Sequence, residues 1–296
     1  MDISVIIVNY NTTALTSQAI ASVIRYAQGV SYEIIVVDNA SADRGIESIQ
    51  EKFPAVRLIL NQDNKGFGAA NNQGMAVAKG AYYFLLNSDA YLCDNALASF
   101  LKFMQTPGNE HYGVCGAELS TGEARETVSF GNFPSLLELF SSFGFYIFYK
   151  TYYKKKLNLG VVNYDAQVKD VDFISGAAMF IRKAVIEKTG RFDEDFFLYF
   201  EETELSYRIH KAGYKSIILP FIKIIHLEGS SQVTTDFNYK RYAFFAISRN
   251  LFYNKSYGPV YAAFAKMLYF IHTAIFAPLR REKGSLLKKL TLIANS

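Results

Sequence analysis

The chain has 296 residues, half of them hydrophobic and 20% charged, with a formal charge of +4. This composition excludes a disordered chain and supplies a sizeable core for one large domain or two modest ones, while the small charge does not indicate nucleic acid as a partner. The two cysteines, Cys93 and Cys115, lack the spacing of a metal site or a disulfide framework. We therefore expect a reduced, cytoplasmic protein.

Apolar runs and helical patterns alternate at the start of the chain. The run at residues 3–8 follows an acidic N-terminus and is too short for a signal peptide, so we expect a strand buried on both faces. Further strands are predicted at 33–37, 56–60 and 82–86, separated by helices at 15–26, 46–53 and 68–77. This alternation predicts a parallel sheet flanked by helices, with all four strand ends at one edge.

The pattern is less regular after residue 115. We expect one strand at 171–182, a helix at 200–212 and another strand at 216–225. The last of these strands contains Pro220 and leads to His226. Residues after 231 are mostly apolar and aromatic, which indicates a C-terminal helical extension.

A polar cluster, Asp38, Asn39 and Ser41, follows the second predicted strand. Ligands of open α/β sheets bind outside the carboxyl ends of the strands, where a carboxylate can accept a hydrogen bond from a base or a ribose hydroxyl. The same residues could instead form only a turn and a helix cap. The cluster alone leaves both interpretations open.

The segment at 61–74 is rich in asparagine and glycine and includes Asn64, Gly66 and Asn71. Glycine lets a backbone approach a ligand closely, and N–H groups at a helix start suit phosphate. No Gly-Lys-Ser/Thr follows, so this is not a phosphate-binding Walker loop, and its position excludes the dinucleotide fingerprint.

Asp89, in the run Asn87-Ser88-Asp89, is a candidate ligand for a divalent cation. A transferase that acts on a nucleotide diphosphate must neutralise the departing diphosphate, and a hard cation on a carboxylate can do so. A simple turn after the strand is the alternative. A lone histidine such as His226 is usually structural, but its neutral imidazole could complete a site built on Asp89.

Three acids, Glu201, Glu202 and Glu204, begin the helix predicted at 200–212. Acids in a first turn complement the helix dipole, and Glu204 can form an ordinary ion pair with Arg208 one turn later. The preceding aromatic run indicates partial burial, which would raise a carboxyl pKa toward the working range of a general base.

Together these clusters resemble the family-2 inverting glycosyltransferases with the GT-A fold, in particular their rhamnosyltransferase-like branch. The matching stretches lie at 8–11, 37–41, 64–68, 71–72, 85–89, 175–182, 190–197, 199–205 and 226–231. They cover about residues 3–231, and the ordered set is far more specific than any single stretch.

The resemblance implies a Rossmann-like, mostly parallel sheet flanked by helices. It implies a catalytic domain at 1–231, with a nucleotide-sugar half to about residue 115 and an acceptor half from 116, and an extension at 232–296. It also implies that Asp38 reads the nucleotide base, that Asp89 and His226 hold Mg²⁺ or Mn²⁺, and that one shared hollow contains these ligands and the catalytic acid.

The resemblance further assigns the acids and the remaining polar residues. Glu202 would deprotonate the acceptor hydroxyl, with Glu201 left as the alternative base. Asn87 stands where the family has the first Asp of its Asp-x-Asp motif, and Glu202 stands where it usually has Asp. Donor contacts are implied for Asn9, Asn11, Asn39, Asn64, Gly66, Asn71, Asn87 and Ser88, and acceptor contacts for Ser175, Gly176 and Glu204.

The implied reaction moves rhamnose or another hexose from dTDP-rhamnose or a UDP-sugar to a glycan or lipid-linked acceptor. A non-catalytic sugar-binding protein on the same scaffold is the main alternative. A nucleotidyltransferase lacks support because no basic loop follows the first strand, and a membrane scaffold would leave the polar clusters unexplained.

The C-terminal segment poses a separate question about membranes. Residues 257–279 contain Lys266 and His272, so we expect them to fall short of an uninterrupted span. The aromatic and basic segments at 143–156 and 261–283 suit an interfacial helix at the inner face of the cell membrane. Packing on the catalytic domain or in a dimer is the alternative.

Overall fold

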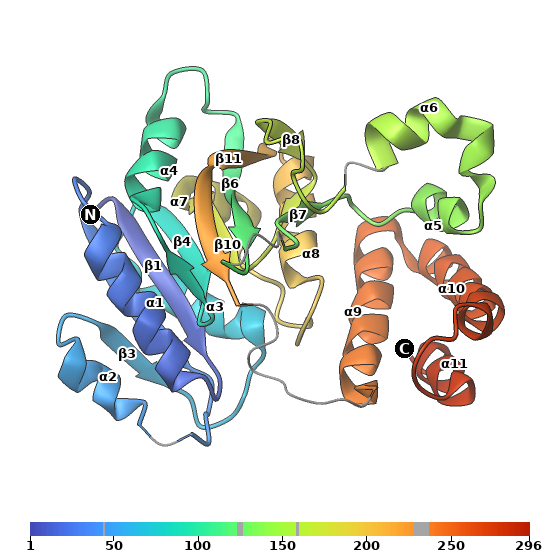
Figure 1. The fold of residues 1–296 in the computed structure, drawn as a ribbon, viewed down its shortest axis with the longest axis horizontal. Helices are drawn as coiled ribbons and strands as arrows, with labels where there is room; N and C mark the ends of the chain where they lie inside the picture. Colours follow the sequence, from blue (N-terminus) through green and yellow to red (C-terminus); the bar gives the residue numbers. More distant parts are fainter. Residues whose placement is uncertain (44, 123–126, 158–159, 228–236) are drawn as a thin grey trace.

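The computed structural model describes residues 1–43, 45–122, 127–157, 160–227 and 237–296, and within them a nine-stranded sheet forms the centre of the molecule (Figure 1). The strand order is β3-β2-β1-β4-β10-β6-β11-β5, and β8 pairs with β11 off this path. The four parallel strands predicted in the first half are confirmed as β1 (Ile3–Asn9), β2 (Tyr32–Asp38), β3 (Arg57–Leu60) and β4 (Tyr82–Asn87).

The helices predicted between these strands are also confirmed. They are α1 (Thr13–Tyr26), α2 (Glu47–Lys52) and α3 (Phe67–Val77). The strand register sets Asn9 beside Asp38, and Val8 beside Asn87. The polar residues that end β1, β2 and β4 therefore lie together at one edge of the sheet, as the crossover rule requires.

The sheet is buried on both faces because alternate side chains of its strands enter two different cores. Ile3, Val5 and Ile7 pack with α1, α2 and α4 (Ala96–Gln105). Ile6 packs with α3, α7 (Lys183–Thr189) and α8 (Glu201–Lys211) on the opposite face. This two-sided burial explains why the strands read as almost continuous apolar runs.

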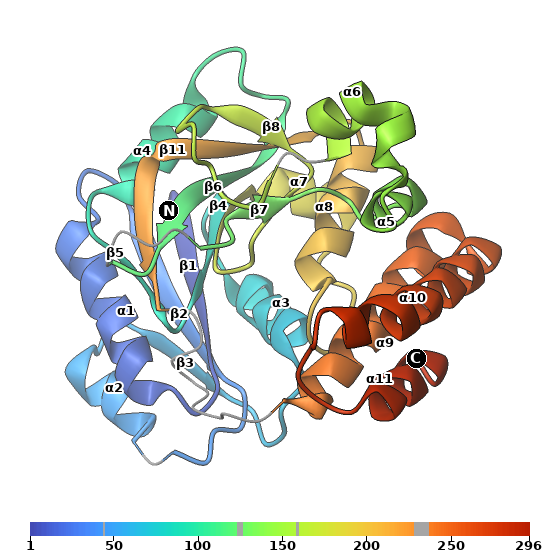
Figure 2. The ribbon, with the colours of Figure 1, turned by 45° about the vertical axis from the view of Figure 1, so that its right-hand side comes forward.

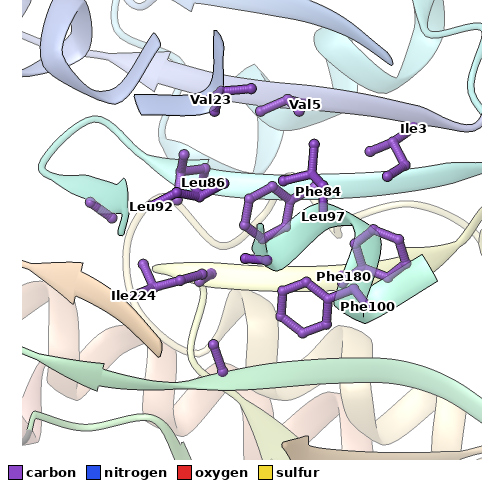
Figure 3. Close-up of a cluster of buried hydrophobic side chains, with 14 of the residues drawn as sticks. Ile3, Val5, Val23, Phe84, Leu86, Leu92, Leu97, Phe100, Phe180 and Ile224 are labelled. Atoms are coloured by element: carbon purple, nitrogen blue, oxygen red, sulfur yellow. The ribbon is translucent and has the colours of Figure 1, made fainter. Parts of the chain in front are cut away.

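Aromatic rings fill the centre of the first core (Figure 3). The rings of Phe100 and Phe180 stack with their centroids 5.0 Å apart, and Phe84 lies beside both. All three side chains are completely buried. Phe100 thereby fixes α4 against β4 and β10 (Ala178–Arg182).

One prediction for the second half is wrong. Residues 171–182 do not form a single strand but divide among β8 (Lys169–Val171), β9 (Phe173–Ile174) and β10. The physical reason is pairing: β9 joins β7 (Phe130–Gly131) in a separate two-stranded sheet, whereas β10 runs antiparallel between β4 and β6 (Tyr112–Ser120). The chain makes the change of sheet through a turn at residues 175–177.

The predicted helix at 200–212 is confirmed as α8, and the last predicted strand is confirmed as β11 (Lys215–His226). The pairing of β11 with β6 shifts register between Leu219 and Lys223, around Pro220, which has no N–H for the ladder. The far end of β11 pairs with β5 (Ala90–Leu92), and this contact brings His226 next to Ala90.

The C-terminal extension is helical, as predicted, and lies to one side of the sheet together with residues 136–157 (Figures 1 and 2). The elements are α9 (Tyr239–Tyr257), α10 (Pro259–Leu279) and α11 (Leu286–Ala294), with α5 (Leu136–Ser142), η1 (Phe145–Tyr149), α6 (Lys150–Tyr152) and η2 (Tyr153–Leu157). A third core joins them to the sheet domain through Phe196, Phe252 and Tyr253. The predicted boundary at 231 and the motif residues 228–231 lie outside the described residues, so the division into domains stays a prediction.

In the described part of the chain, α10 is the one helix that is long and apolar enough to cross a membrane by length and composition alone. An 18-residue window of α10 has a mean hydropathy of 1.4, and 17% of that window is buried. The helix includes both polar interruptions noted in the sequence, Lys266 and His272. It packs against α5, α9 and α11.

Replacing Phe100 with alanine tests the packing of the first core. We expect Phe100→Ala to lower the free energy of unfolding by about 3–5 kcal/mol, because it removes a completely buried ring that stacks on Phe180. Urea unfolding followed by circular dichroism measures this change. The matched control is Phe148→Ala, whose ring is 79% exposed and whose loss should change stability by less than about 0.5 kcal/mol. Equal effects of the two substitutions would contradict the packing described here.

Candidate active site

A hollow of about 390 Å³ opens at the carboxyl ends of β1, β2 and β4. Five of the donor-site candidates line it, namely Asn39, Asn64, Gly66, Asn87 and Ser88, and Asp89 lines it as well. We call this cavity the donor hollow. Its wall is completed by side chains from α9 and from the loop before α8.

Asp38, the last residue of β2, is held in place by hydrogen bonds from neighbouring residues of the protein. Its Oδ1 accepts hydrogen bonds from Asn9 Nδ2 at 2.7 Å and from Ser41 Oγ at 2.6 Å, and its Oδ2 accepts one from Ser41 N at 3.1 Å. The residue is only 4% exposed. Asn9 and Ser41 thus fix the orientation of the carboxylate, while Oδ2 retains capacity for a further donor.

Asn39 organises the loop that carries Asn64 and Gly66. Its side chain donates to Asn64 Oδ1 at 2.8 Å and to Gly66 O at 3.2 Å, and it accepts from Lys65 N at 3.0 Å. Gly66 has φ = +86°, and a Cβ there would overlap the carbonyl oxygen of Phe197. Only glycine therefore suits this close approach of the loop to the segment before α8.

Two further donor-site candidates, Asn11 and Asn71, form hydrogen bonds to other residues of the protein. Asn11 Oδ1 accepts from Ala42 N at 2.6 Å, which ties the loops after β1 and β2 together. Asn71 is buried, and its Nδ2 donates to Phe67 O at 3.0 Å within α3. Asn11 and Asn71 do not line the donor hollow, and their hydrogen bonds hold the segments around it.

Asp89 and His226 come together at the margin of the donor hollow. His226 Nε2 lies 3.3 Å from Asp89 Oδ1, and the backbone N–H of Leu227 donates to Asp89 O at 2.9 Å. The β5–β11 pairing creates this contact, since it sets His226 opposite Ala90, the residue that follows Asp89. His226 Nδ1 is buried and has no hydrogen-bond partner among the described residues.

The chemistry of this pair fits a divalent cation. A carboxylate oxygen and an imidazole nitrogen suit Mn²⁺, and a carboxylate also suits Mg²⁺. No group of three or more His, Cys, Asp or Glu side chains that could hold a metal occurs within the described ranges. An ion bound by two protein ligands would keep open positions for the oxygens of a diphosphate.

Glu201 and Glu202 begin α8 after a strained turn. Tyr199 and Phe200 both have positive φ, at +70° and +66°, which re-aims the chain just before the acids. In each glutamate, Oε2 is enclosed and lacks a hydrogen-bond partner within the part of the chain described. Burial raises the pKa of both carboxyl groups, and the charge of Glu202 raises the pKa of Glu201 further.

Glu202 lines a second hollow, of about 370 Å³, which we call the acceptor-side hollow. The prediction of one shared hollow is therefore replaced by two neighbouring cavities. Residues 197 and 198 line the donor hollow and residues 199 and 200 line the acceptor-side hollow, so one short loop borders both. Phe67 lines the donor hollow and Glu202 lines the acceptor-side hollow, and Gly176, in a segment that the sequence predicted as strand, approaches both residues.

The turn at 175–177 contacts the residues of both cavities. A Cβ at Gly176 would lie 3.2 Å from the ring of Phe67, which lines the donor hollow, and 3.9 Å from Glu202 Cβ. The next residue, Ala177, accepts a hydrogen bond from Asn87 N at 3.0 Å. Ser175 is held by its own N–H, which donates to Ser129 O at 3.0 Å. Gly176 and Ala177 thus lie between Asn87 and Glu202, whereas Ser175 and Gly176, the acceptor candidates, line neither hollow.

Glu204 has a partner within its own helix. Its two carboxylate oxygens accept from Arg208 Nε at 2.6 Å and from Arg208 Nη2 at 2.8 Å, in a bidentate ion pair. Arg208 also donates to the carbonyl oxygens of Thr189 and Arg191. This is the helical pair that the sequence offered as the alternative to acceptor contact.

Sequence reasoning missed several residues of the donor hollow, among them one threonine and three residues of α9. Thr12 lines it and donates to Ser88 Oγ at 2.8 Å. Lys240, Arg241 and Phe244 line it from α9, a helix that the sequence assigned to the apolar extension. Phe244 stacks on Phe197 with centroids 4.9 Å apart, and Arg241 Nε donates to Tyr199 OH. The sequence signal that could have pointed to α9 is the basic pair at 240–241, shortly after His226.

A mostly parallel sheet with a polar hollow at its carboxyl edge and a helical extension defines the GT-A class of glycosyltransferase fold, and solved structures of that class agree. The chain is similar to a mannosyltransferase from Pyrobaculum calidifontis, solved with GDP-mannose and Mn²⁺. The TM-score is 0.58 at 17% identity, with 99% of this chain and 79% of the other covered.

Residues 4–189 match the family described as Glycosyl transferase family 2, and the chain belongs to this family. It is 33% identical over 125 residues to an uncharacterised glycosyltransferase of Haemophilus influenzae, a match over 39% of this chain and 49% of the relative. It is 22% identical over 214 residues to the N-acetylglucosaminyl-diphospho-decaprenol L-rhamnosyltransferase of Mycobacterium tuberculosis, over 67% of each chain. The match thus spans about half of the first relative's length.

The two buried carboxyl groups predict a pH-dependent loss of stability. A carboxyl group whose pKa is raised by folding binds more protons in the folded than in the unfolded state, so stability falls as pH rises. The window begins near the ordinary value of 4.5 and extends up to the raised pKa. We expect Glu201→Gln to flatten this slope and to raise the stability at neutral pH, because the amide leaves no charge to be buried.

Urea unfolding across the weakly acidic to weakly alkaline range measures this slope. Glu51→Gln is the matched control, because Glu51 is exposed on α2 and should leave the slope unchanged. A slope in Glu201→Gln as steep as in the unchanged protein would contradict the raised pKa.

Proposed function

We propose that the protein is an inverting, metal-dependent glycosyltransferase that moves a hexose from a nucleotide diphosphate to a hydroxyl of a glycan or lipid-linked acceptor. The observation that carries the proposal is the contact of His226 with Asp89, which lines the donor hollow, together with the enclosed Glu202 carboxyl in the neighbouring acceptor-side hollow. Rhamnose is one candidate sugar, and dTDP-rhamnose and UDP-sugars are candidate donors. The reaction would serve cell-surface polysaccharide synthesis.

The donor side of the mechanism uses the edge of the sheet. Asp38, with Asn39 and the loop it holds, would bind the nucleoside, and Ser88 and Asn87 would face the diphosphate. The basic residues Lys240 and Arg241, which line the same hollow, would attract its negative charge. A divalent cation held by Asp89 and His226 would neutralise the charge that develops on the leaving diphosphate.

The acceptor side depends on Glu202. Its deprotonated carboxylate would take the proton of the acceptor hydroxyl as that oxygen forms a bond to the anomeric carbon. The bond between the anomeric carbon and the diphosphate oxygen breaks on the opposite face, which inverts the configuration. In this scheme Glu201, which is buried beside Glu202, is a positioning residue. Because Glu201 also carries a carboxyl group, it remains the alternative base.

Removing the proposed base should abolish transfer and spare donor binding. We expect Glu202→Gln to lower the transfer rate by about 10²–10⁴-fold, since a neutral amide cannot accept the proton. A screen of dTDP-rhamnose, UDP-hexoses and GDP-mannose for nucleotide release identifies the donor, and calorimetry then compares donor binding. Because burial raises the pKa of Glu202, transfer in the unchanged protein should rise with pH above the ordinary carboxyl range.

The control for this experiment is Glu51→Gln, which should transfer at the normal rate. Near-normal transfer by Glu202→Gln would contradict its role as the base. If Glu201→Gln alone removed transfer, the role would pass to Glu201. Donor binding without nucleotide release for every acceptor offered would favour the alternative of a non-catalytic sugar-binding protein.

The metal pair makes a second prediction, about affinity. We expect Mn²⁺ to strengthen binding of the nucleoside diphosphate, and Asp89→Asn and His226→Ala to remove most of this effect because each takes away one of two protein ligands. Titration calorimetry with and without a chelator measures it. Asp63→Asn, on an exposed loop residue, is the control. An undiminished Mn²⁺ effect in both site variants would contradict the assignment.

A further inference from the structure

An exposed apolar stripe runs the length of α10. Its members recur every three or four residues, which is the spacing of one helix face. Their exposed fractions range from 39% to 82%, and they are Val260, Phe264, Met267, Ile271, Ile275 and Leu279. The opposite side of the helix buries Ala262, Ala265 and Ala277. α10 therefore presents one apolar face to its partners in the protein and a second one outward.

A second group of exposed apolar side chains adjoins this stripe. Phe145, Ile147 and Phe148 project from η1, with exposed fractions of 48%, 62% and 79%. The two groups are joined by packed rings, since Phe140 contacts Phe264 and Phe143 contacts Phe276. In Figure 2, α5, the helix before η1, lies beside α10. We call the combined surface the α10–η1 face.

Exposed basic side chains follow both parts of the α10–η1 face along the chain. The exposed residues are Lys150, Lys154, Lys155 and Lys156 after η1, and Arg280, Arg281 and Lys283 after α10. The acids in segments 136–157 and 257–296 are Glu138 and Glu282, and Glu282 pairs with Lys289. An apolar centre with a basic margin matches the boundary of a membrane with anionic head groups.

The charge argues against a second copy of the chain as the occupant. A two-fold interface would bring the same patch together from both copies, and here it would oppose two sets of lysines and arginines. The packing argues against a membrane-spanning helix. Tyr261 accepts a hydrogen bond from Leu136 N at 2.7 Å, and Lys266 Nζ donates to Ser296 O at 2.6 Å, so α10 is bound along its inner side to the rest of the protein.

We propose that the α10–η1 face docks on an anionic lipid surface, with α10 lying in the plane of the head groups. The acceptor-side hollow shares two residues, Glu138 and Leu157, with the segment that carries η1. Docking therefore holds this hollow close to the membrane, where a lipid-linked acceptor hydroxyl is available. The docking itself does not depend on the sugar-transfer reaction, because it is measured without nucleotide.

Co-sedimentation of the full chain with vesicles tests the proposal. We expect binding to phosphatidylcholine vesicles that contain phosphatidylglycerol, binding at least about tenfold weaker to pure phosphatidylcholine, and weakening by salt. Replacing Lys154, Lys155 and Lys156 with glutamine should cost about tenfold or more in binding. The double substitution Ile147→Ser with Phe148→Ser should lower binding to both kinds of vesicle.

Matched controls change similar side chains elsewhere. Phe221→Ser removes an apolar side chain that is 58% exposed on β11, and Lys52→Gln with Lys79→Gln removes two exposed charges. Both should bind vesicles normally, and circular dichroism confirms that every variant is folded. Absence of binding at low salt, equal binding to neutral vesicles, or equal loss in the controls would overturn the proposal. A dimer detected by sedimentation equilibrium would also overturn the proposal if Phe148→Ser dissociated it and left vesicle binding unchanged.

Discussion

The contact between Asp89 and His226 is the interaction on which the candidate site depends. The two residues lie far apart in the chain and meet because β5 and β11 pair antiparallel at the end of the sheet. The strand that delivers His226 runs beside β6 first and shifts register around Pro220 before it reaches β5. The fold thus brings a carboxylate oxygen and an imidazole nitrogen from distant parts of the chain to within 3.3 Å of each other.

The second constraint is the burial of Glu201 and Glu202. A carboxylate removed from water without a hydrogen-bond partner is costly, so the folded state favours the protonated form. The same burial makes the carboxylate a stronger base once the proton has left. The turn at Tyr199 and Phe200, with positive φ at both residues, orients the start of α8 toward the acceptor-side hollow. At the start of α8, the burial that makes these carboxylates stronger bases therefore also lowers the stability of the fold when they are charged.

The first half of the fold was predictable because β1, β2 and β4 are largely buried and read as nearly continuous apolar runs. The break between β9 and β10 was not, since nothing local in residues 171–182 reveals that β9 pairs with β7 in another sheet. Asp89, His226 and Glu202 were predicted as site residues from residue type and order, and their roles stay predictions. Thr12 and Lys240 were missed, because a threonine after a strand and a lysine at a helix start are common everywhere. Their position in the donor hollow exists only after folding.

The central claim is that Asp89 and His226 ligate one divalent cation together with the donor diphosphate. Electron spin-echo spectroscopy of Mn²⁺ bound with a nucleoside diphosphate tests it most directly, because coupling to nitrogen identifies an imidazole ligand. The account predicts a nitrogen coupling that disappears in His226→Ala, while phosphorus coupling from the diphosphate remains. A spectrum without nitrogen coupling, or one that is unchanged by the substitution, would contradict it.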